Sequence, residues 1–341
     1  MDSVSAKLNT PLWSKTNPKI RGFNESWNFK MSDPAHNRAL SLRFNILIAE
    51  NGFRKVSEVW AVYSERGSDR ELKKIAVRQS QGIDSFSTPR PGEVRIGNCS
   101  FGPTTTRGSI QSKGHTIEWD LNFASIKPIT FNRIPQVLRK YKLVRDFGVT
   151  VAEDLVFSGT AKIDGREVTW TAAKGMQSHL AGPHTNYAWV WAHSNTMEQD
   201  QGEDSGFIFE ALSTKSRWFG KVHSPEVSSF FFWYKGAPHV FNGIWQSVRC
   251  QSKHTLKEWT FRVEQGELSF RGKISAELKD FIGLAYEDTD GSQVHAALSQ
   301  GSNSKIQVFR RGKLEVSYSS SGGTSYEVAS RARNQHVPSA V

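Results

Sequence analysis

KGMQSHLAGPHTNYAWVWAHSNT, residues 174–196, is the stretch on which the fold prediction rests. Its second half alternates strictly between large and small side chains, as a β-strand does when its two faces differ. The large face carries rings and polar tips: Tyr187, Trp189, Trp191, His193 and Asn195. The small face consists of Ala188, Val190, Ala192 and Ser194. This alternation predicts a strand that packs closely on one side and presents aromatic rings on the other.

The same period of two recurs along most of the chain. In residues 39–48, ALSLRFNILI, five apolar side chains alternate with Ser41, Arg43 and Asn45, which predicts a half-buried strand. Residues 108–123 and 157–172 are predicted hairpins, because Lys113-Gly114 and Asp164-Gly165 are turn-forming pairs between alternating segments. Short strands parted by Gly, Asp, Asn or Ser continue through the last third of the sequence. Such spacing is typical of antiparallel sandwiches and barrels, so the predicted class is all-β with few short helices.

The length of 341 residues suits two domains, since a domain usually has about 100–200 residues. The polar stretch 194–206 is the predicted boundary, which gives an N-terminal domain of residues 21–200 and a C-terminal domain of residues 201–330. Residues 1–20 and 331–341 are predicted arms, and the last is expected to fray. The best helix candidate is 134–146, where Pro135 stands near the start of an amphipathic pattern.

The charge balance shows 44 Lys and Arg against 33 Asp and Glu, a net charge of +11. The basic residues are scattered among acids, so they predict a solvated surface and no nucleic-acid partner, while a transient contact with an anionic membrane surface stays open. No run of about 18 apolar residues suggests a spanning helix. The two cysteines, Cys99 and Cys250, have no metal-ligand or disulfide-scaffold spacing. Together with the lack of a signal core, these features predict a cytoplasmic protein.

The aromatic face of residues 187–195 has two interpretations. The rings can fill a core, with His193 hydrogen-bonded to a buried partner, or they can line a ligand cavity in which His193 and Asn195 orient a molecule. His179, between Gly175 and Gly182, is expected on a loop held over the mouth of such a cavity. An ordinary histidine pKa lies near 6.5, so either imidazole could transfer protons near neutral pH.

A zinc site from His179, His184 and His193 would need three convergent ligands, and no spacing supports it. We therefore predict no metal and no cofactor. The predicted catalytic residues are His179 and His193. The predicted ligand-binding residues are Tyr187, Trp189, Trp191, Asn195, His184 and Trp119.

The order of these segments resembles a known superfamily. IEWDLNF (117–123), FSGTAKIDG (157–165), the stretch 174–196 and YEDTDG (286–291) are similar to the lipocalin-like superfamily of carotenoid 1,2-hydratase (hydroxyneurosporene synthase), tocopherol-cyclase-like proteins and fungal lipocalin-like Diels–Alderases. Two motifs carry the resemblance. The first is a G-[YM]-x-x-H-x-x-G segment at Gly175, Met176, His179 and Gly182, and the second is W-x-W-x-H at Trp189, Trp191 and His193. Leu180 and Ala181 stand where relatives often have Asn-Trp.

The resemblance extends over residues 40–316. It implies two antiparallel lipocalin-like (calycin) β-barrels packed together, with a hydrophobic pocket at or near their contact. It also implies apolar, extended ligands such as isoprenoids, polyenes or polyketides. The fold supports two functions. One is an enzyme that hydrates, cyclises or isomerises such a molecule with help from a histidine acid or base, and the other is a non-catalytic carrier. Histidines that point into a cavity would favour chemistry, and histidines tied to backbone carbonyls outside it would favour binding. The sequence does not predict an oligomeric state.

Overall fold

The computed structural model describes residues 3–14, 21–67, 71–127, 129–134, 146–199, 206–216 and 223–341. These residues form two large antiparallel sheets with few short helices, which confirms the all-β prediction. The α-helices of the described ranges are α1 (Ser3–Leu8) and α3 (Ile244–Arg249). Single 3-10 turns span Pro34–His36, Ile83–Ser85 and Leu278–Asp280. The predicted helix 134–146 lies almost entirely outside the described residues.

The first sheet curves into a nearly closed barrel, because β4 at one end of the strand order packs against β8 and β9. Its order is β4-β3-β2-β1-β12-β11-β9-β8-β7-β6-β5, with β10 beside β11. Its strands are β1 (Phe23–Asp33), β2 (Arg38–Ile48), β3 (Lys55–Arg66), β4 (Leu72–Gly82), β5 (Phe86–Ser87), β6 (Val94–Ile96), β7 (Cys99–Phe101), β8 (Thr105–Ser112), β9 (His115–Ser125), β10 (Phe131–Asn132), β11 (Phe147–Ile163) and β12 (Arg166–Gly182).

Both predicted hairpins are present in this sheet. Lys113-Gly114 joins β8 to β9, and Asp164-Gly165 joins β11 to β12. All four residues have positive φ, between 52° and 82°, as a two-residue turn matched to the twist of the strands requires.

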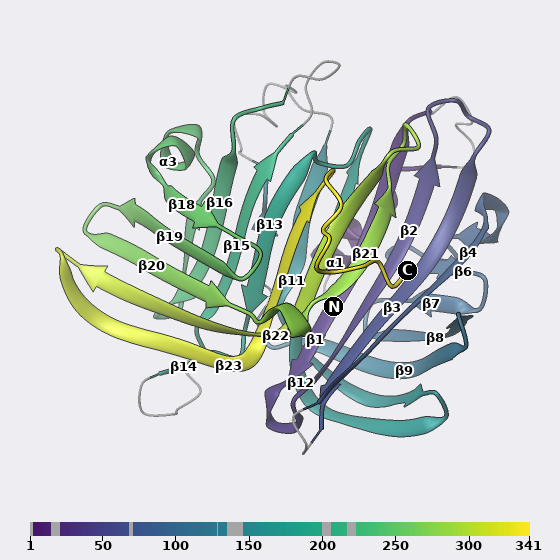
Figure 1. Cartoon of the computed structure of the whole chain (residues 1–341), viewed down its shortest axis with the longest axis horizontal. Coiled ribbons are helices and arrows are strands. Elements are labelled where there is room, and N and C mark those ends of the chain that lie inside the picture. Colours follow the sequence, from purple (N-terminus) through teal and green to yellow (C-terminus); the bar gives the residue numbers. More distant parts are fainter. Residues whose placement is uncertain are drawn as a thin grey trace.

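The second sheet has the order β17-β16-β15-β13-β23-β22-β20-β19-β18, with β14 beside β23 and β21 beside β22. Figure 1 shows it in green and yellow on the left, with the first sheet on the right. Its strands are β13 (Ala188–Ser194), β14 (Glu198–Gln199), β15 (Ile208–Lys215), β16 (Val227–Tyr234), β17 (Ala237–Phe241), β18 (Gln251–His254), β19 (Glu258–Gln265), β20 (Leu268–Ser275), β21 (Ile282–Glu287), β22 (Gln293–Arg310) and β23 (Lys313–Ser330). The chain crosses between the sheets at residues 183–187, whereas the predicted division was at 200/201.

Each sheet encloses an apolar core, and further apolar clusters lie where the sheets meet. Trp60 and Val62 of β3 pack there with Leu284 and Tyr286 of β21. The contact explains why the half-buried assignment of residues 39–48 was wrong. Ser41 and the other polar residues of that strand were expected to lie on an open face, but the second sheet covers it, and Ser41 donates to Gln300.

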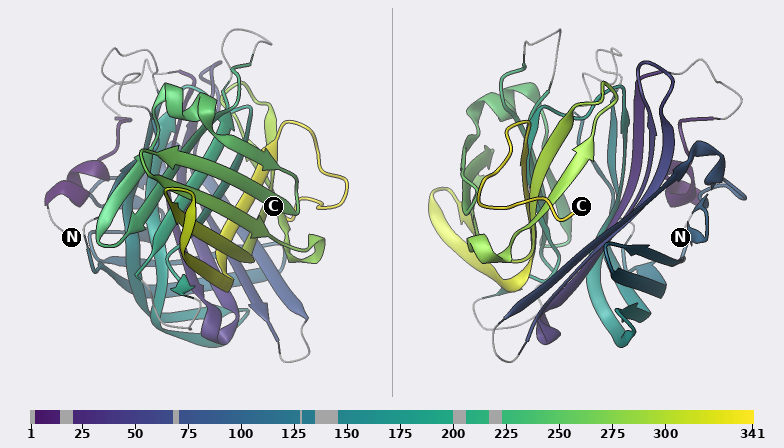
Figure 2. Two further views of the ribbon diagram at one scale, coloured as in Figure 1. Left: turned by 90° about the vertical axis from the view of Figure 1, so that its left-hand side faces the viewer. Right: turned by 45° about the vertical axis from the view of Figure 1, so that its right-hand side comes forward.

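The C-terminal tail is docked, and the expectation that it frays was wrong. Ser339 forms a bridge with Gly283 of β21, and the Ala285 N–H donates to the carbonyl of Val341 at 3.0 Å. Val337 is buried in the second core. Figure 2 shows the yellow tail returning to the body of the protein. Backbone pairing and an apolar anchor therefore hold a segment whose composition suggested a free end.

Candidate active site between the two sheets

The aromatic face of β13 points toward the first sheet. Val190 and Ala192, on its small face, belong to the core of the second sheet, so the opposite face must lie outside that core. Exposure falls along the aromatic face, since Trp189 is half-buried whereas Trp191 and His193 are 5% and 3% exposed. The face therefore leads from the surface into the contact between the sheets.

At the inner end of this face, His193 meets Glu153 of β11. The imidazole Nε2 donates to the Glu153 backbone carbonyl at 3.1 Å and lies 3.3 Å from its carboxyl Oε2. Glu153 is fully buried, and within the described part of the chain no N–H or hydroxyl group donates a hydrogen bond to its carboxyl oxygens. Its carboxyl instead shares a hydrogen bond with a second carboxyl, that of Glu210, which requires one of the two groups to keep a proton. Two carboxyls that meet in this way are costly to bury, so their presence needs an explanation other than packing.

A second buried carboxyl, Glu210 of β15, is fully partnered. The Arg133 guanidinium lies 2.5 Å from Oε1, and the Trp191 indole N–H donates to the same oxygen at 2.7 Å. Thr150 of β11 donates its hydroxyl to Oε2 at 2.5 Å. Glu210 is thus surrounded by the donors that an ionised carboxylate requires.

These surroundings push the two carboxyl pKa values apart. Burial raises the pKa of Glu153 well above its usual range, and the negative charge of Glu210 adds to the rise. Burial also acts to raise the pKa of Glu210, but Arg133 and the hydrogen bonds from Glu153, Thr150 and Trp191 outweigh it, so this pKa is lowered. Glu153 therefore keeps its proton to a higher pH than an ordinary carboxyl does, beside a Glu210 that ionises more readily. In active sites, two neighbouring carboxyls often have one raised and one lowered pKa, so that the first can act as an acid while the second stays ionised.

His193 does not have the ordinary histidine pKa that the sequence analysis assumed. Burial lowers the pKa of His193 to about 4. The imidazole is neutral at pH 7, so it cannot supply a proton there.

Two cations complete the cluster around Trp191. Lys30 of β1 places its Nζ 4.3 Å from the centre of the Trp191 ring and 3.3 Å from Oε2 of Glu327. The guanidinium carbon of Arg133 lies 5.8 Å from the centre of the same ring. Glu327 also accepts the Trp189 indole N–H at 2.9 Å. Burial lowers the pKa of Lys30, although Glu327 acts to raise it.

His179 lies apart from this cluster. It belongs to strand β12, so the predicted glycine-flanked loop over a cavity mouth was wrong. The glycines serve close packing: a Cβ on Gly175 would lie 1.9 Å from the Lys30 carbonyl oxygen, and one on Gly182 would lie 2.3 Å from Asp146 Oδ1. His179 Nδ1 donates to the carbonyl of Leu8 at 2.7 Å.

The remaining predicted residues are dispersed. Asn195 donates to the carbonyl of Gly175 at 2.9 Å, so it ties β13 to the first sheet. Tyr187 stacks on His223 at 3.6 Å, and His184 bonds Thr289 at 3.0 Å. Trp119 lies inside the first barrel with its N–H donated to Thr106. The structure therefore brings together Trp189, Trp191 and His193 of the predicted set, with Asn195 alongside.

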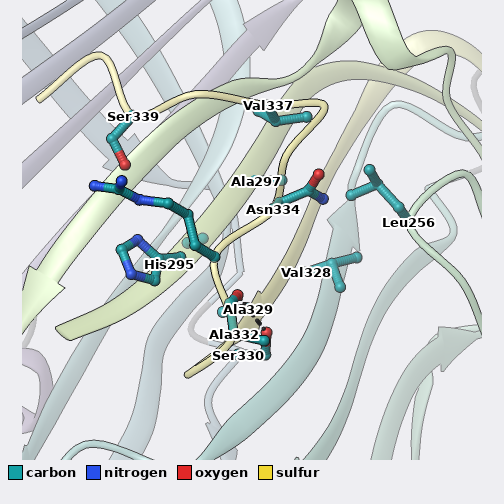
Figure 3. A pocket seen from close by; sticks show the side chains of 12 residues that line it. Leu256, His295, Ala297, Val328, Ala329, Ser330, Ala332, Asn334, Val337 and Ser339 are labelled. Atoms are coloured by element: carbon teal, nitrogen blue, oxygen red, sulfur yellow. Dashed lines mark hydrogen bonds between the residues drawn. The ribbon is translucent and has the colours of Figure 1, made fainter.

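The described residues contain small cavities at other places. One of about 60 Å³ lies under the C-terminal tail, where His295, Asn334 and Val337 line it (Figure 3). Another of about 40 Å³ lies beside Arg38 and Gln300. Ligand pockets usually measure about 300–1,000 Å³, so neither cavity holds an extended apolar molecule.

In the ranges that the structure describes, no three His, Cys, Asp or Glu side chains converge as metal ligands. The helices within those ranges are too short or too polar to cross a membrane.

The predicted site residues did not include Lys30, Arg133, Glu153 and Glu210. Two of them carried a signal. Glu153 interrupts the apolar run of residues 149–157, and Glu210 interrupts FIFEAL, residues 207–212. An acid in the middle of an apolar strand pattern is unusual, because burial of a charge is costly. Nothing in the local pattern around Lys30 or Arg133 marks either residue.

The sequence matches no protein-family model and no curated protein. Two solved structures are similar across nearly the whole chain. A protein provisionally named AttH from Nitrosomonas europaea has a TM-score of 0.51 at 13% identity, covering 91% of this chain and 92% of that one. Kievitone hydratase from Nectria haematococca has a TM-score of 0.51 at 11% identity, covering 96% of this chain and 92% of that one. At these identities the similarity establishes the lipocalin-like fold alone.

Proposed function

We propose that this protein is an enzyme that acts on an apolar, unsaturated small molecule at the contact between its two sheets. Glu153 is the general acid. The observation that carries the proposal is the fully buried Glu153 carboxyl, which shares a hydrogen bond with the Glu210 carboxyl and has a raised pKa. Groups with strongly shifted pKa values gather at functional sites, because catalysis needs an acid that stays protonated at working pH.

The first reaction to test is hydration. Water adds its hydroxyl to the far end of a double bond that is conjugated to a carbonyl, and negative charge develops on the carbonyl oxygen. Glu153 then donates its proton to the carbon next to the carbonyl, and the proton that the water loses restores Glu153. Arg133 acts to lower the pKa of Glu153, so it stabilises the carboxylate between the two steps. That a kievitone hydratase shares the fold supports this choice of reaction. Cyclisation and isomerisation also need a proton transfer from Glu153.

The cations indicate the kind of substrate. Lys30 lies over the ring of Trp191, and Arg43 lies 4.6 Å from the centre of the Tyr286 ring. These ring faces already hold a cation, so they offer little to a developing carbocation. Lys30 and Arg133 instead favour negative charge that develops on an oxygen. An enone or polyketide-like carbonyl compound therefore fits the site better than a plain isoprenoid alkene.

The test replaces Glu153 with glutamine, which keeps the shape but cannot donate an acidic proton. Glu153→Gln should lower turnover by about 100- to 10,000-fold while ligand affinity changes by less than about tenfold. Asp120→Asn is the matched control, because Asp120 is exposed and pairs with Arg107 on the outer face of the first barrel. The assay follows conversion of a panel of conjugated carbonyl compounds and simple alkenes by mass spectrometry. Equal turnover by both variants would remove Glu153 from the mechanism.

A non-catalytic carrier is the second candidate function, and one observation favours it. His179 and His193 both bond backbone carbonyls, of Leu8 and Glu153. That was the arrangement expected of a carrier. Mass spectrometry of molecules that co-purify with the protein separates the two candidates. A carrier would release one unchanged molecule, while an enzyme incubated with that molecule would convert it.

A further inference from the structure

The first barrel holds a second set of buried polar side chains, and the chain's own N-terminal arm, residues 3–14, occupies it. In Figure 2 the short purple helix α1 lies against the first sheet. Beyond the helix, Trp13 is buried in the core of the first barrel with its ring edge-on to Phe86 at 5.7 Å. The arm is therefore inserted into the barrel at one end.

Glu25 and His179 bind the backbone of this arm. The Glu25 carboxylate accepts the backbone N–H of Leu12 at 2.7 Å and that of Trp13 at 3.0 Å. His179 Nδ1 donates to the Leu8 carbonyl at 2.7 Å, while Nε2 lies 2.8 Å from Oε1 of Glu25. Both side chains are fully buried. Their geometry places acceptors and donors for an amide chain inside the barrel.

Trp27 and Gln177 extend the same site around Asn9. The Trp27 indole N–H donates to the Asn9 carbonyl at 3.2 Å. The side-chain amides of Gln177 and Asn9 exchange two hydrogen bonds, at 3.1 and 3.2 Å. The His179 ring stacks on Trp27 at 4.7 Å. In the described residues, the side chains of Glu25, Trp27, Gln177 and His179 form their hydrogen bonds with the arm and with one another.

The site binds mainly backbone groups of the arm, so it does not require a particular order of side chains. Most of the groups that it binds are backbone carbonyls and N–H groups next to one aromatic ring, that of Trp13. An apolar plug would close a barrel without burying a carboxylate and an imidazole, which are costly to bury. The four buried side chains therefore form a built binding site whose present occupant is a peptide segment.

The outer side of the arm is loosely held. Val4 and Leu12 are 53% and 52% exposed. The helix α1 has six residues, and a helix of that length is not stable by itself in water. The arm can therefore leave the barrel without taking apart a sheet, because none of its residues is part of one.

We propose that the first barrel contains a second ligand site, formed by Glu25, Trp27, Gln177 and His179, for aromatic molecules that carry neighbouring amide carbonyl and N–H groups. The N-terminal arm is its internal competitor. This site is separate from Glu153, and the proposal does not depend on any reaction there.

The test uses the full chain and two probes. The first probe is a fluorescent peptide of residues 3–14, and the second is N-acetyltryptophanamide, which combines an indole with two amides. Trp13→Ala weakens the internal arm, so this variant should bind the peptide at least tenfold more tightly than the unaltered chain. Val4→Ala is the matched control, since it alters an exposed side chain of the same arm that the site does not bind, so this variant should bind like the unaltered chain. N-acetyltryptophanamide should displace the peptide, and Glu25→Gln in the Trp13→Ala chain should weaken peptide binding at least tenfold.

Three results would overturn the proposal. The first is no saturable peptide binding by a Trp13→Ala chain that melts cooperatively. The second is equal binding by all variants. The third is displacement by 3-methylindole as effective as by N-acetyltryptophanamide, because that would show a hole for a ring and no recognition of amides. If Trp13→Ala does not fold, Asn9→Ala weakens the same arm without removing its ring, and the same outcomes apply.

Discussion

Glu153 and Glu210 face the same contact, yet the same substitution should change stability in opposite directions. Glu210→Gln removes the partner of a buried Arg133, and breaking a buried ion pair costs about 3–5 kcal/mol. Glu153→Gln replaces a carboxyl that folding forces to keep its proton. Gln is neutral in both states, so this substitution should stabilise the protein at pH 7.

The pH dependence follows from the signs of the pKa shifts. Because the pKa of Glu153 is raised in the native chain, its contribution to stability is fully present at pH values below its pKa in the unfolded chain. This contribution is lost as the pH rises toward its pKa in the native chain. The advantage of Glu153→Gln should therefore grow by about 1.4 kcal/mol for each pH unit above an unfolded pKa near 4.3, until the folded pKa is reached. The lowered pKa of Glu210 has the opposite effect. The contribution of Glu210 to stability is present at pH values above its pKa in the unfolded chain. It is lost as the pH falls through its pKa in the native chain.

Urea denaturation of the three proteins between pH 4 and pH 8 measures both effects. The Glu153→Gln chain should approach the unaltered chain near pH 4 and exceed it at pH 7. The Glu210→Gln deficit should be largest at neutral pH. If Glu153→Gln destabilises the protein at pH 7 as much as Glu210→Gln does, Glu153 is an ionised partner in the network. The acid role would then have no basis.

Two further predictions concern β12 and β13. Burial lowers the pKa of His193 to about 4, so the native chain should lose stability as pH falls from about 6.5 toward 4, while the unfolded chain takes up a proton first. His193→Gln should remove this dependence in urea titrations at pH 4.5 and 7, and an unchanged slope would contradict the assignment. Gly175→Ala should destabilise the fold by about 1–3 kcal/mol or more, because its Cβ would meet the Lys30 carbonyl oxygen. Gly82→Ala, with φ −60° and no atom within 4 Å of an added Cβ, should stay within about 1 kcal/mol, and equal losses would show that close packing is not the cause.

Local patterns in the sequence were sufficient to predict the strands and hairpins. Alternation along residues 187–195 and the Lys113-Gly114 and Asp164-Gly165 turns depend on neighbours in sequence, which is why these predictions were confirmed. The glycines near His179 gave the wrong answer, because Gly175 meets β1, a strand about 145 residues away in sequence.

The candidate site could be predicted only in part, because its groups come from distant strands. Trp191 and His193 were found through their alternation. Glu153 was not, since its significance depends on Glu210 and on burial by the opposite sheet. No period or motif records which charges a tertiary contact will bring together.

The polar pairs at the contact share one property: each joins the two sheets. Lys30 to Glu327 and Arg133 to Glu210 both run from the first sheet or its flanking residues to the second. Pairs of this kind fix how two surfaces fit together, so by themselves they explain the charges without any catalysis. Glu153 is different, because the group that it meets on the second sheet is another carboxyl, and the two hold together only while one of them keeps a proton. Alignment of the sheets does not require such a proton, since an ion pair joins them without one. Glu153 is therefore the residue at this contact that chemistry requires and alignment does not, and the matched glutamine substitutions test it against Glu210.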